Sequence, residues 1–223
     1  MKLRNKNLKI LKSNHVYSEE MEHDACGVGL VASTEGIKSR KVVEYGIDAL
    51  KAVWHRGAID ADGKTGDGAG IHIEIPKDFF EEKIEVTGHK HDNSELCVGM
   101  IFLPRNDYSA QEQCRTIVES ELTKRNFSIY GWRQVPVDPS VLGEKAEQTR
   151  PEITQVLFTY NDKKVVNKSL EQKLYETRRV IEKEALNNQL NNFYICSFSS
   201  KSIIYKGMFL AEALSDFYTD LKD

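Results

Sequence analysis

Two short apolar runs, each followed by a proline, constrain what this chain can fold into. Residues Ala69–Ile75 alternate isoleucine with small or polar residues, and Pro76 follows them. Residues Leu96–Leu103 are apolar apart from one glycine, and Pro104 follows them. Since proline cannot donate the next hydrogen bond of a sheet ladder, each run predicts a β-strand that ends at its proline.

Hydrophobic periodicity predicts further elements on both sides of these runs. Apolar residues recur at helical spacing over Arg40–Trp54 and predict an amphipathic helix. Other helices are expected over Lys77–Glu85, Ser109–Arg125 and Ser169–Asn187. Other strands are expected over Cys26–Ala32, Phe127–Val137 and Gln155–Tyr160, with a hairpin made by Phe193–Ser197 and Ser202–Tyr205. Strands gather toward both ends with helices between them, which indicates a layered α/β or α+β domain.

Size and charge limit the class of protein. The chain has 223 residues, enough for one large domain or two small ones with a substantial core. No run approaches the ~18 consecutive apolar residues of a transmembrane helix. Lys and Arg number 31 against 34 Asp and Glu, and this balance argues against a general nucleic-acid binder. We therefore expect neither a membrane nor a nucleic acid as partner.

Residues 1–25 differ in character from the rest of the chain. Positions 1–18 carry five basic residues and no acidic one, and they lack the 7–15-residue apolar stretch of a secretory signal. A transit peptide is the less favoured alternative for such a segment. We interpret residues 1–25 as a polar leader ahead of a folded domain.

The four cysteines indicate a reducing compartment. None of them forms a C-x-x-C pair, which excludes a zinc ribbon or a thioredoxin-like motif. Cys97, Cys114 and Cys196 lie in apolar or periodic stretches and are expected to be buried, free thiols. The cytoplasm is therefore the expected location.

Two glycine motifs and one histidine cluster are candidate ligand sites. Gly27–Ala32 matches G-x-G-x-x-A, but it forms the expected strand itself and does not follow one, as a dinucleotide site requires. Gly57 and Gly63 are separated by five residues where a P-loop needs four, so a glycine- and aspartate-rich turn is favoured. His89 and His91 could join Asp92 and Cys97 as metal ligands, but a solvated loop is the favoured interpretation.

Cys26 stands apart because it follows the polar leader and Ala25 directly and begins the expected strand. If the chain is cut before Cys26, this residue gains a free α-amine beside its own thiol. An α-amine has a pKa of about 7.7–8.0 and a thiol one of about 8.5, so the amine can accept the thiol proton near neutral pH. A self-contained pair of nucleophile and base is typical of N-terminal nucleophile hydrolases.

Six blocks of sequence together carry a family resemblance. They are HDACGVGLVA (23–32), AVWHRGAIDADGKTGDGAGI (52–71), VGMIFLP (98–104), GWRQVPVD (131–138), VLGEKAEQTRPEITQV (141–156) and FYICSFSSKSIIYKGM (193–208). In this order they resemble segments of the class II glutamine amidotransferase domain that begins the large subunit of glutamate synthases. The resemblance covers nearly the whole chain from about residue 20 onward.

The resemblance implies a fold and a reaction. The fold is α+β, a four-layer αββα sandwich of the N-terminal nucleophile hydrolases, incomplete at its C-terminal side. Residues 1–25 would be a removed propeptide and residues 26–223 a partial amidotransferase domain. Cys26 would attack the side-chain amide of glutamine, release ammonia through a γ-glutamyl thioester, and free glutamate after hydrolysis. Arg56, Asp67 and Gly68 would belong to the substrate pocket, although each is also an ordinary turn residue.

The sequence also departs from the family pattern. Family members supply a His-x-Arg-Phe-Ser-Thr-Asn segment that holds the substrate carboxylate and an Asn-Gly pair for the oxyanion hole, and neither occurs here. The loss of one oxyanion donor alone costs about 10²–10³ in turnover. We therefore expect the isolated chain to be inactive or very weak, and to be the first piece of a longer protein.

Three functional hypotheses remain open at this point. The chain is the nucleophile-bearing part of a glutaminase completed by a second segment, an inert truncated piece, or a thiol hydrolase of another N-terminal nucleophile family. No cofactor is expected in these residues, because the family's FMN, iron–sulfur cluster and NAD(P)H or ferredoxin electron supply belong to other regions. The expected partners are glutamine, the remainder of the large subunit and a small subunit.

Overall fold

The fold is described from a computed structural model, which covers residue 6 and residues 27–53, 59–91, 94–162 and 168–222. The helices are α2 (Arg40–Ala52), α3 (Lys77–Val86), α4 (Tyr108–Lys124), α5 (Glu144–Thr149), α6 (Lys168–Asn187) and α7 (Leu214–Phe217). The strands are β1 (Ala69–Glu74), β2 (Leu96–Leu103), β3 (Phe127–Gln134), β4 (Glu152–Tyr160), β5 (Tyr194–Ser199) and β6 (Ser202–Gly207). Short 3₁₀ turns are η2 (Pro139–Val141), η3 (Ala211–Ala213) and η4 (Thr219–Lys222). None of the helices in these ranges is long and apolar enough to cross a membrane.

Two antiparallel sheets form the centre of the molecule. Four strands pair in the order β3–β4–β2–β5, and β1 pairs with β6 in a second, two-stranded sheet. Val98 on β2 lies opposite Leu157 on β4 and Ser199 on β5, which fixes the register of the larger sheet. In the smaller sheet Ile71 lies opposite Tyr205. The strands expected at the two proline-ended runs are confirmed as β1 and β2.

The core is divided by the four-stranded sheet. On β2, Leu96, Val98 and Met100 are buried in a cluster that includes Ile203 and Tyr205 of the smaller sheet, so the two sheets pack face to face. The alternate β2 residues Cys97, Ile101 and Leu103 are buried in a second cluster, formed with residues of α4 and α6. Burial on both faces explains why β2 is apolar along its whole length.

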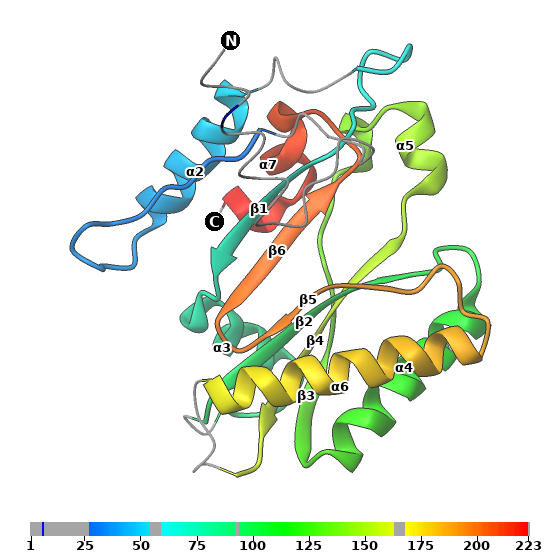
Figure 1. Ribbon diagram of the computed structural model, residues 1–223. Coiled ribbons are helices and arrows are strands. Elements are labelled where there is room, and N and C mark those ends of the chain that lie inside the picture. Colours follow the sequence, from blue (N-terminus) through cyan, green and yellow to red (C-terminus); the bar gives the residue numbers. More distant parts are fainter. Residues whose placement is uncertain (1–5, 7–26, 54–58, 92–93, 163–167, 223) are drawn as a thin grey trace.

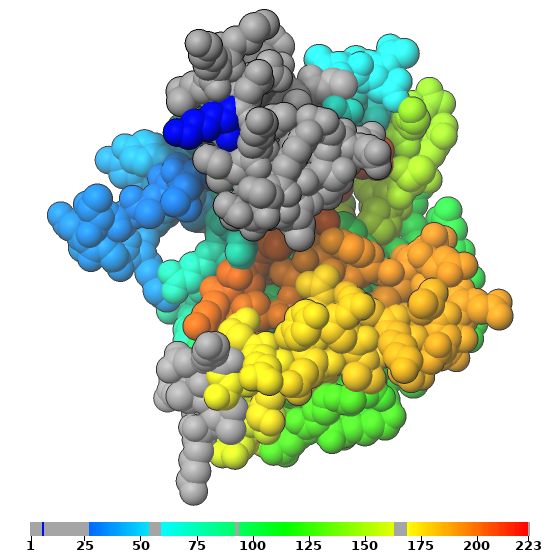
Figure 2. All heavy atoms as spheres, viewed as in Figure 1, coloured from blue at the N-terminus to red at the C-terminus, as the bar shows by residue number. Residues whose placement is uncertain are grey.

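The helices flank this pair of sheets. Figure 1 shows α4 and α6 along one side of the molecule and α2 on the far side, beside β1. In Figure 2 the yellow surface of α6 lies over the green surface of α4. The expected α+β class is confirmed, with helices, one sheet and a second sheet stacked in that order.

One expected strand is wrong in the part that the structure describes. Residues Gly27–Ala32 have no regular secondary structure, and Val28 and Leu30 are 90% and 92% exposed. An apolar run becomes a strand only where a neighbour accepts its backbone hydrogen bonds. No strand of the described chain pairs with Gly27–Ala32, so this segment is not a central strand of either sheet.

The expected hairpin is also wrong, although both of its strands exist. β5 pairs with β2 and β6 pairs with β1, so the chain changes sheet at the turn between them. The Glu171 carboxylate on α6 holds this turn: it accepts from Ser200 N at 2.8 Å and from Ser199 Oγ at 3.0 Å. Because this anchor comes from a distant helix, the local turn sequence could not reveal the crossing.

Two predicted ends also differ from the structure. β3 ends at Gln134, before the expected Val137, because Pro136 cannot donate to the sheet. α2 ends at Ala52, and Trp54 lies outside the described residues. The remaining strand and helix positions agree with the sequence prediction to within three residues.

Candidate active site

The predicted site residues fall into two groups. Cys26 and Arg56 lie outside the described residues. Asp67 and Gly68 lie in the segment 59–68 that leads into β1, which we call the glycine-rich loop.

The glycine-rich loop folds back on itself as a tight turn. Ile59 and Gly66 form an antiparallel bridge, and Asp60 N donates to Thr65 O at 2.9 Å. Gly63 N donates to Asp60 O, also at 2.9 Å. These bonds give the loop a defined backbone although it belongs to neither sheet.

The Asp62 carboxylate closes the turn from within. Its Oδ1 accepts from Lys64 N at 3.0 Å and from Thr65 N at 2.7 Å, and its Oδ2 accepts from Thr65 Oγ1 at 2.5 Å. These hydrogen bonds, led by the one from the Thr65 hydroxyl, lower the pKa of Asp62 far below its ordinary value. Asp62 is therefore a fixed acceptor of the loop and not a candidate proton carrier.

The closed turn docks against the start of α5. Thr65 is 2% exposed, and its Oγ1 accepts from Ala146 N at 3.3 Å. A Cβ at Gly143 would overlap Asp62 Oδ2 and Thr65 Oγ1 and stand 2.6 Å from Thr65 N. Only glycine at position 143 allows this close approach of loop and helix.

An exposed ion pair adds to the docking contact. Lys145 Nζ on α5 lies 2.7 Å from Asp60 Oδ2. This pair lowers the pKa of Asp60 and raises that of Lys145, in both cases mainly through the hydrogen bond between them. Solvent reaches both side chains, so the pair contributes little to the stability of the fold.

The other side of the loop lies along the end of β6. A Cβ at Gly66 would stand 3.0 Å from Phe209 O, and one at Gly68 would stand 3.4 Å from Gly207 O. Gly68 has a φ of +125°, which side-chain-bearing residues rarely adopt. Asp67 and Gly68 are both exposed to solvent. These two predicted residues, which are neighbours in the sequence, thus lie on a fixed, solvent-facing backbone.

The three described cysteines are unreactive as nucleophiles. Cys97, Cys114 and Cys196 are free and buried, as predicted. Burial raises the pKa of Cys114 and of Cys196 to about 11, and it raises that of Cys97 well above its usual range. These thiols are therefore protonated at neutral pH and are not candidate nucleophiles.

The histidine segment is solvent-exposed over residues 88–90, as expected, but His91 at its end is not solvated. The His91 side chain is only 7% exposed, and its Nδ1 lies 3.0 Å from Glu81 Oε1 on α3. Its ring also packs against Tyr130 at 5.8 Å between centroids. The described residues contain no cluster of three or more His, Cys, Asp or Glu side chains that could hold a metal ion. His72 on β1, by contrast, is exposed.

A buried polar network between the sheets was missed at the sequence level. Arg133 on β3 pairs with Asp220 of η4 and donates to Gln155 Oε1 at 2.8 Å. Gln155 Nε2 in turn donates to Tyr205 OH at 3.4 Å. The only signal in the sequence is a charged and an amide residue within otherwise β-like segments.

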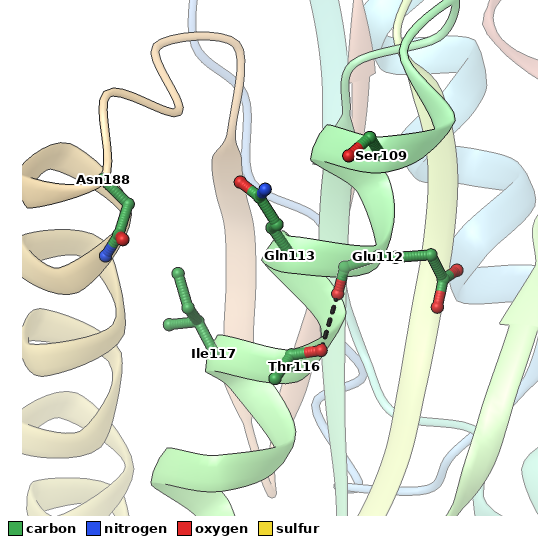
Figure 3. A pocket seen from close by; sticks show the side chains of 6 residues that line it. All are labelled: Ser109, Glu112, Gln113, Thr116, Ile117 and Asn188. Atoms are coloured by element: carbon green, nitrogen blue, oxygen red, sulfur yellow. Dashed lines mark hydrogen bonds between the residues drawn. The ribbon is translucent and has the colours of Figure 1, made fainter.

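A shallow hollow lies away from the glycine-rich loop. It has a volume of about 610 Å³. Figure 3 shows the side chains that line it, on α4 and on the residue that follows α6. Its lining residues are Ser109, Glu112, Gln113, Thr116, Ile117 and Asn188. The Thr116 hydroxyl donates to Glu112 O at 2.8 Å and so serves its own helix. We assign no ligand to this open, mainly helical surface.

Comparison with known proteins identifies the family. Residues 26–223 match the profile of the class-II glutamine amidotransferases. The chain belongs to this family, and the resemblance seen in the sequence is confirmed.

Three similar proteins are glutamate synthases. The large chain of an NADPH glutamate synthase from Azospirillum brasilense is 55% identical over 217 residues, which are 97% of this chain and 14% of that protein. A ferredoxin-dependent glutamate synthase 2 from Synechocystis is 38% identical over 203 residues, 91% of this chain and 13% of that protein. A chloroplastic ferredoxin-dependent glutamate synthase 2 from Arabidopsis thaliana is 37% identical over 218 residues, 96% of this chain and 13% of that protein. The chain thus spans about one seventh of these relatives.

Proposed function

We propose that this chain is the glutaminase part of a glutamate synthase and that Cys26 is its nucleophile. The observation that supports the proposal is the start of the class-II match at Cys26 itself. Residues 1–25 then form a removable leader, and residues 26–223 form part of the amidotransferase domain. The buried state of the other three cysteines leaves Cys26 as the one thiol suited to attack.

The proposed reaction needs only the groups of Cys26 to begin. Its α-amine takes the thiol proton, and the sulfur attacks the δ-carbon of the glutamine amide. The amide nitrogen takes up that proton and leaves as ammonia, which gives a γ-glutamyl thioester. Water then adds to the thioester, and its hydrolysis releases glutamate and restores the thiol. Arg56, Asp67 and Gly68 are proposed to line the glutamine pocket.

The proposed partners and cofactors follow the family resemblance and, for the electron supply, the relatives' names. The ammonia would be consumed in the rest of a glutamate synthase polypeptide, with a small subunit as a further partner. NADPH and ferredoxin appear in the names of the relatives, and we place electron supply, FMN and the iron–sulfur cluster outside these residues. The free, buried thiols favour a reducing compartment such as the cytoplasm.

The test is glutamine hydrolysis by the full-length polypeptide that carries this sequence. We expect glutamate and ammonia to form in equal amounts, and Cys26→Ser to lower the rate by about three orders of magnitude or more. Cys114→Ala removes a buried thiol instead and is the matched control. Turnover that survives in Cys26→Ser, or is lost equally in Cys114→Ala, would refute the assignment of the nucleophile.

A further inference from the structure

We infer that the docking of the glycine-rich loop onto α5 positions Asp67 and Gly68 in the glutamine pocket, with Thr65 and Gly143 as the positioning residues. The inference rests on the proposed function, because only that function makes this loop part of a pocket. Figure 1 shows the cyan loop beside α5, at the end of the molecule opposite α4 and α6.

Hydrophobic burial does not fix the glycine-rich loop. Within segment 59–68 only Thr65 and Gly66 are buried, and the one large apolar side chain, Ile59, is 52% exposed. An exposed loop with little apolar contact normally samples several conformations. The position of this loop therefore depends on its polar contacts and on close backbone approach.

The Thr65 hydroxyl joins the loop to α5. It donates to Asp62 Oδ2 at 2.5 Å and accepts from Ala146 N at 3.3 Å. A single buried hydroxyl thus closes the turn and connects the closed turn to the helix. Because Asp67 follows two residues later, a displacement of Thr65 is transmitted directly to the exposed part of the loop.

α5 is itself fixed to the central sheet. Glu147 on α5 pairs with Arg105, which follows β2, at 2.5 Å, and with Arg150 at 2.7 Å. These arginines lower the pKa of Glu147, with the Arg150 hydrogen bond as the larger cause. A continuous path of contacts therefore runs from the end of β2 through Glu147 and Gly143 to the glycine-rich loop. These contacts connect the position of the loop to the four-stranded sheet.

The test compares glutamine turnover with the intrinsic reactivity of Cys26. In the full-length polypeptide, Thr65→Val keeps the shape and removes the hydroxyl, and Gly143→Ala places a methyl group in the docking contact. We expect both to lower kcat/KM for glutamine at least about tenfold, since small misplacements of binding groups are costly. Alkylation of Cys26 by iodoacetamide should remain unchanged, because the thiol and its α-amine are untouched.

Two controls separate positioning from stability. Thr65→Ser restores the hydroxyl and should recover kcat/KM. Thr149→Val removes a hydroxyl on the same helix that bonds only to backbone oxygens of α5, and it should leave kcat/KM unchanged. If Gly143→Ala does not fold, the pair Thr65→Val and Thr65→Ser decides.

The outcomes distinguish this inference from the proposed function. Wild-type turnover that depends on Cys26, with unchanged kcat/KM in Thr65→Val, overturns the positioning role alone. Parallel loss of turnover and alkylation, together with a lower Tm, shows a structural role and also overturns it. If the wild type has no turnover that depends on Cys26, the proposed function fails, and this inference fails with it.

Discussion

Arg133 and Asp220 are 87 positions apart in the sequence and form a bidentate ion pair between β3 and η4. Arg133 Nη1 lies 2.7 Å from Asp220 Oδ2, and Nη2 lies 2.6 Å from Oδ1. The two side chains are 14% and 4% exposed. The pair ties the last described turn of the chain to the edge of the four-stranded sheet, beside the core that joins both sheets.

Breaking this pair on one side should be costly. Asp220→Asn leaves the buried Arg133 guanidinium without its counter-charge, and we expect a loss of about 3–5 kcal/mol in the free energy of unfolding. Urea denaturation measures this loss. Asp216→Asn is the matched control, because Asp216 pairs with Lys222 at 2.9 Å on the surface and should change stability by less than about 1 kcal/mol.

The double replacement sharpens the test. Arg133→Met combined with Asp220→Leu removes both charges and should be less destabilising than Asp220→Asn alone. A loss for Asp220→Asn no greater than that for Asp216→Asn would show that the buried pair contributes nothing.

The secondary structure was predictable where an apolar run is buried in the structure and a proline marks its end. β2 appears as predicted over Leu96–Leu103, because both of its faces are buried and Pro104 ends it. A similar apolar pattern gave a wrong strand prediction at Gly27–Ala32. A strand needs a neighbouring strand to pair with, and the local sequence does not show whether one is present. The crossing of the chain from one sheet to the other between β5 and β6 was missed for the same reason, because the Glu171 carboxylate that accepts from Ser200 N lies 29 positions away in the sequence.

The candidate site was only partly predictable. The glycine- and aspartate-rich composition of segment 59–68 identified a loop, and the family resemblance selected Asp67 and Gly68 within it. Gly143 carried no such signal, because its missing Cβ matters only when Thr65, far away in the sequence, lies against it. α5 was missed as well, since its six residues are too few to show a helical period.

Acid should weaken the fold through Glu121 on α4. This side chain is 8% exposed, lies 2.7 Å from Lys124 Nζ and also pairs with Arg125. The hydrogen bond from Lys124 is the main cause that lowers the pKa of Glu121, with Arg125 adding to it. A lowered folded pKa means that the stabilisation is complete above the unfolded value of about 4.3 and is lost as pH falls through the folded value.

The corresponding variant is Glu121→Gln. We expect it to cost about 1–2 kcal/mol at pH 7 and to lose less stability than the wild type between pH 5 and the acid transition. Urea unfolding at a series of pH values measures both. Glu176→Gln on the exposed face of α6 is the control and should follow the wild-type curve. An acid dependence of Glu121→Gln equal to that of the wild type would contradict this assignment.

Thiol labelling should single out Cys26. With a pKa of about 11, Cys114 and Cys196 are only ~0.1% thiolate at pH 8, and burial protects them further. Iodoacetamide should therefore modify one thiol quickly in the folded protein, and Cys26→Ser should abolish that fast phase. In a denaturant the remaining cysteines should all react. Fast modification of Cys97, Cys114 or Cys196 in the native state, located by peptide mass, would show that the core opens locally.

Removal of the leader should depend on Cys26. Residues 1–25 carry no core-like pattern, the class-II match begins at Cys26, and the proposed base exists only after cleavage before this residue. We expect the purified protein to lack residues 1–25 by intact mass, and Cys26→Ala to retain them. Cys114→Ala should be processed like the wild type, because the Cys114 thiol is buried and has no proposed role in cleavage. Equal processing of Cys26→Ala would assign the cut to a separate protease. An uncleaved wild type that still hydrolyses glutamine would refute the α-amine as the base.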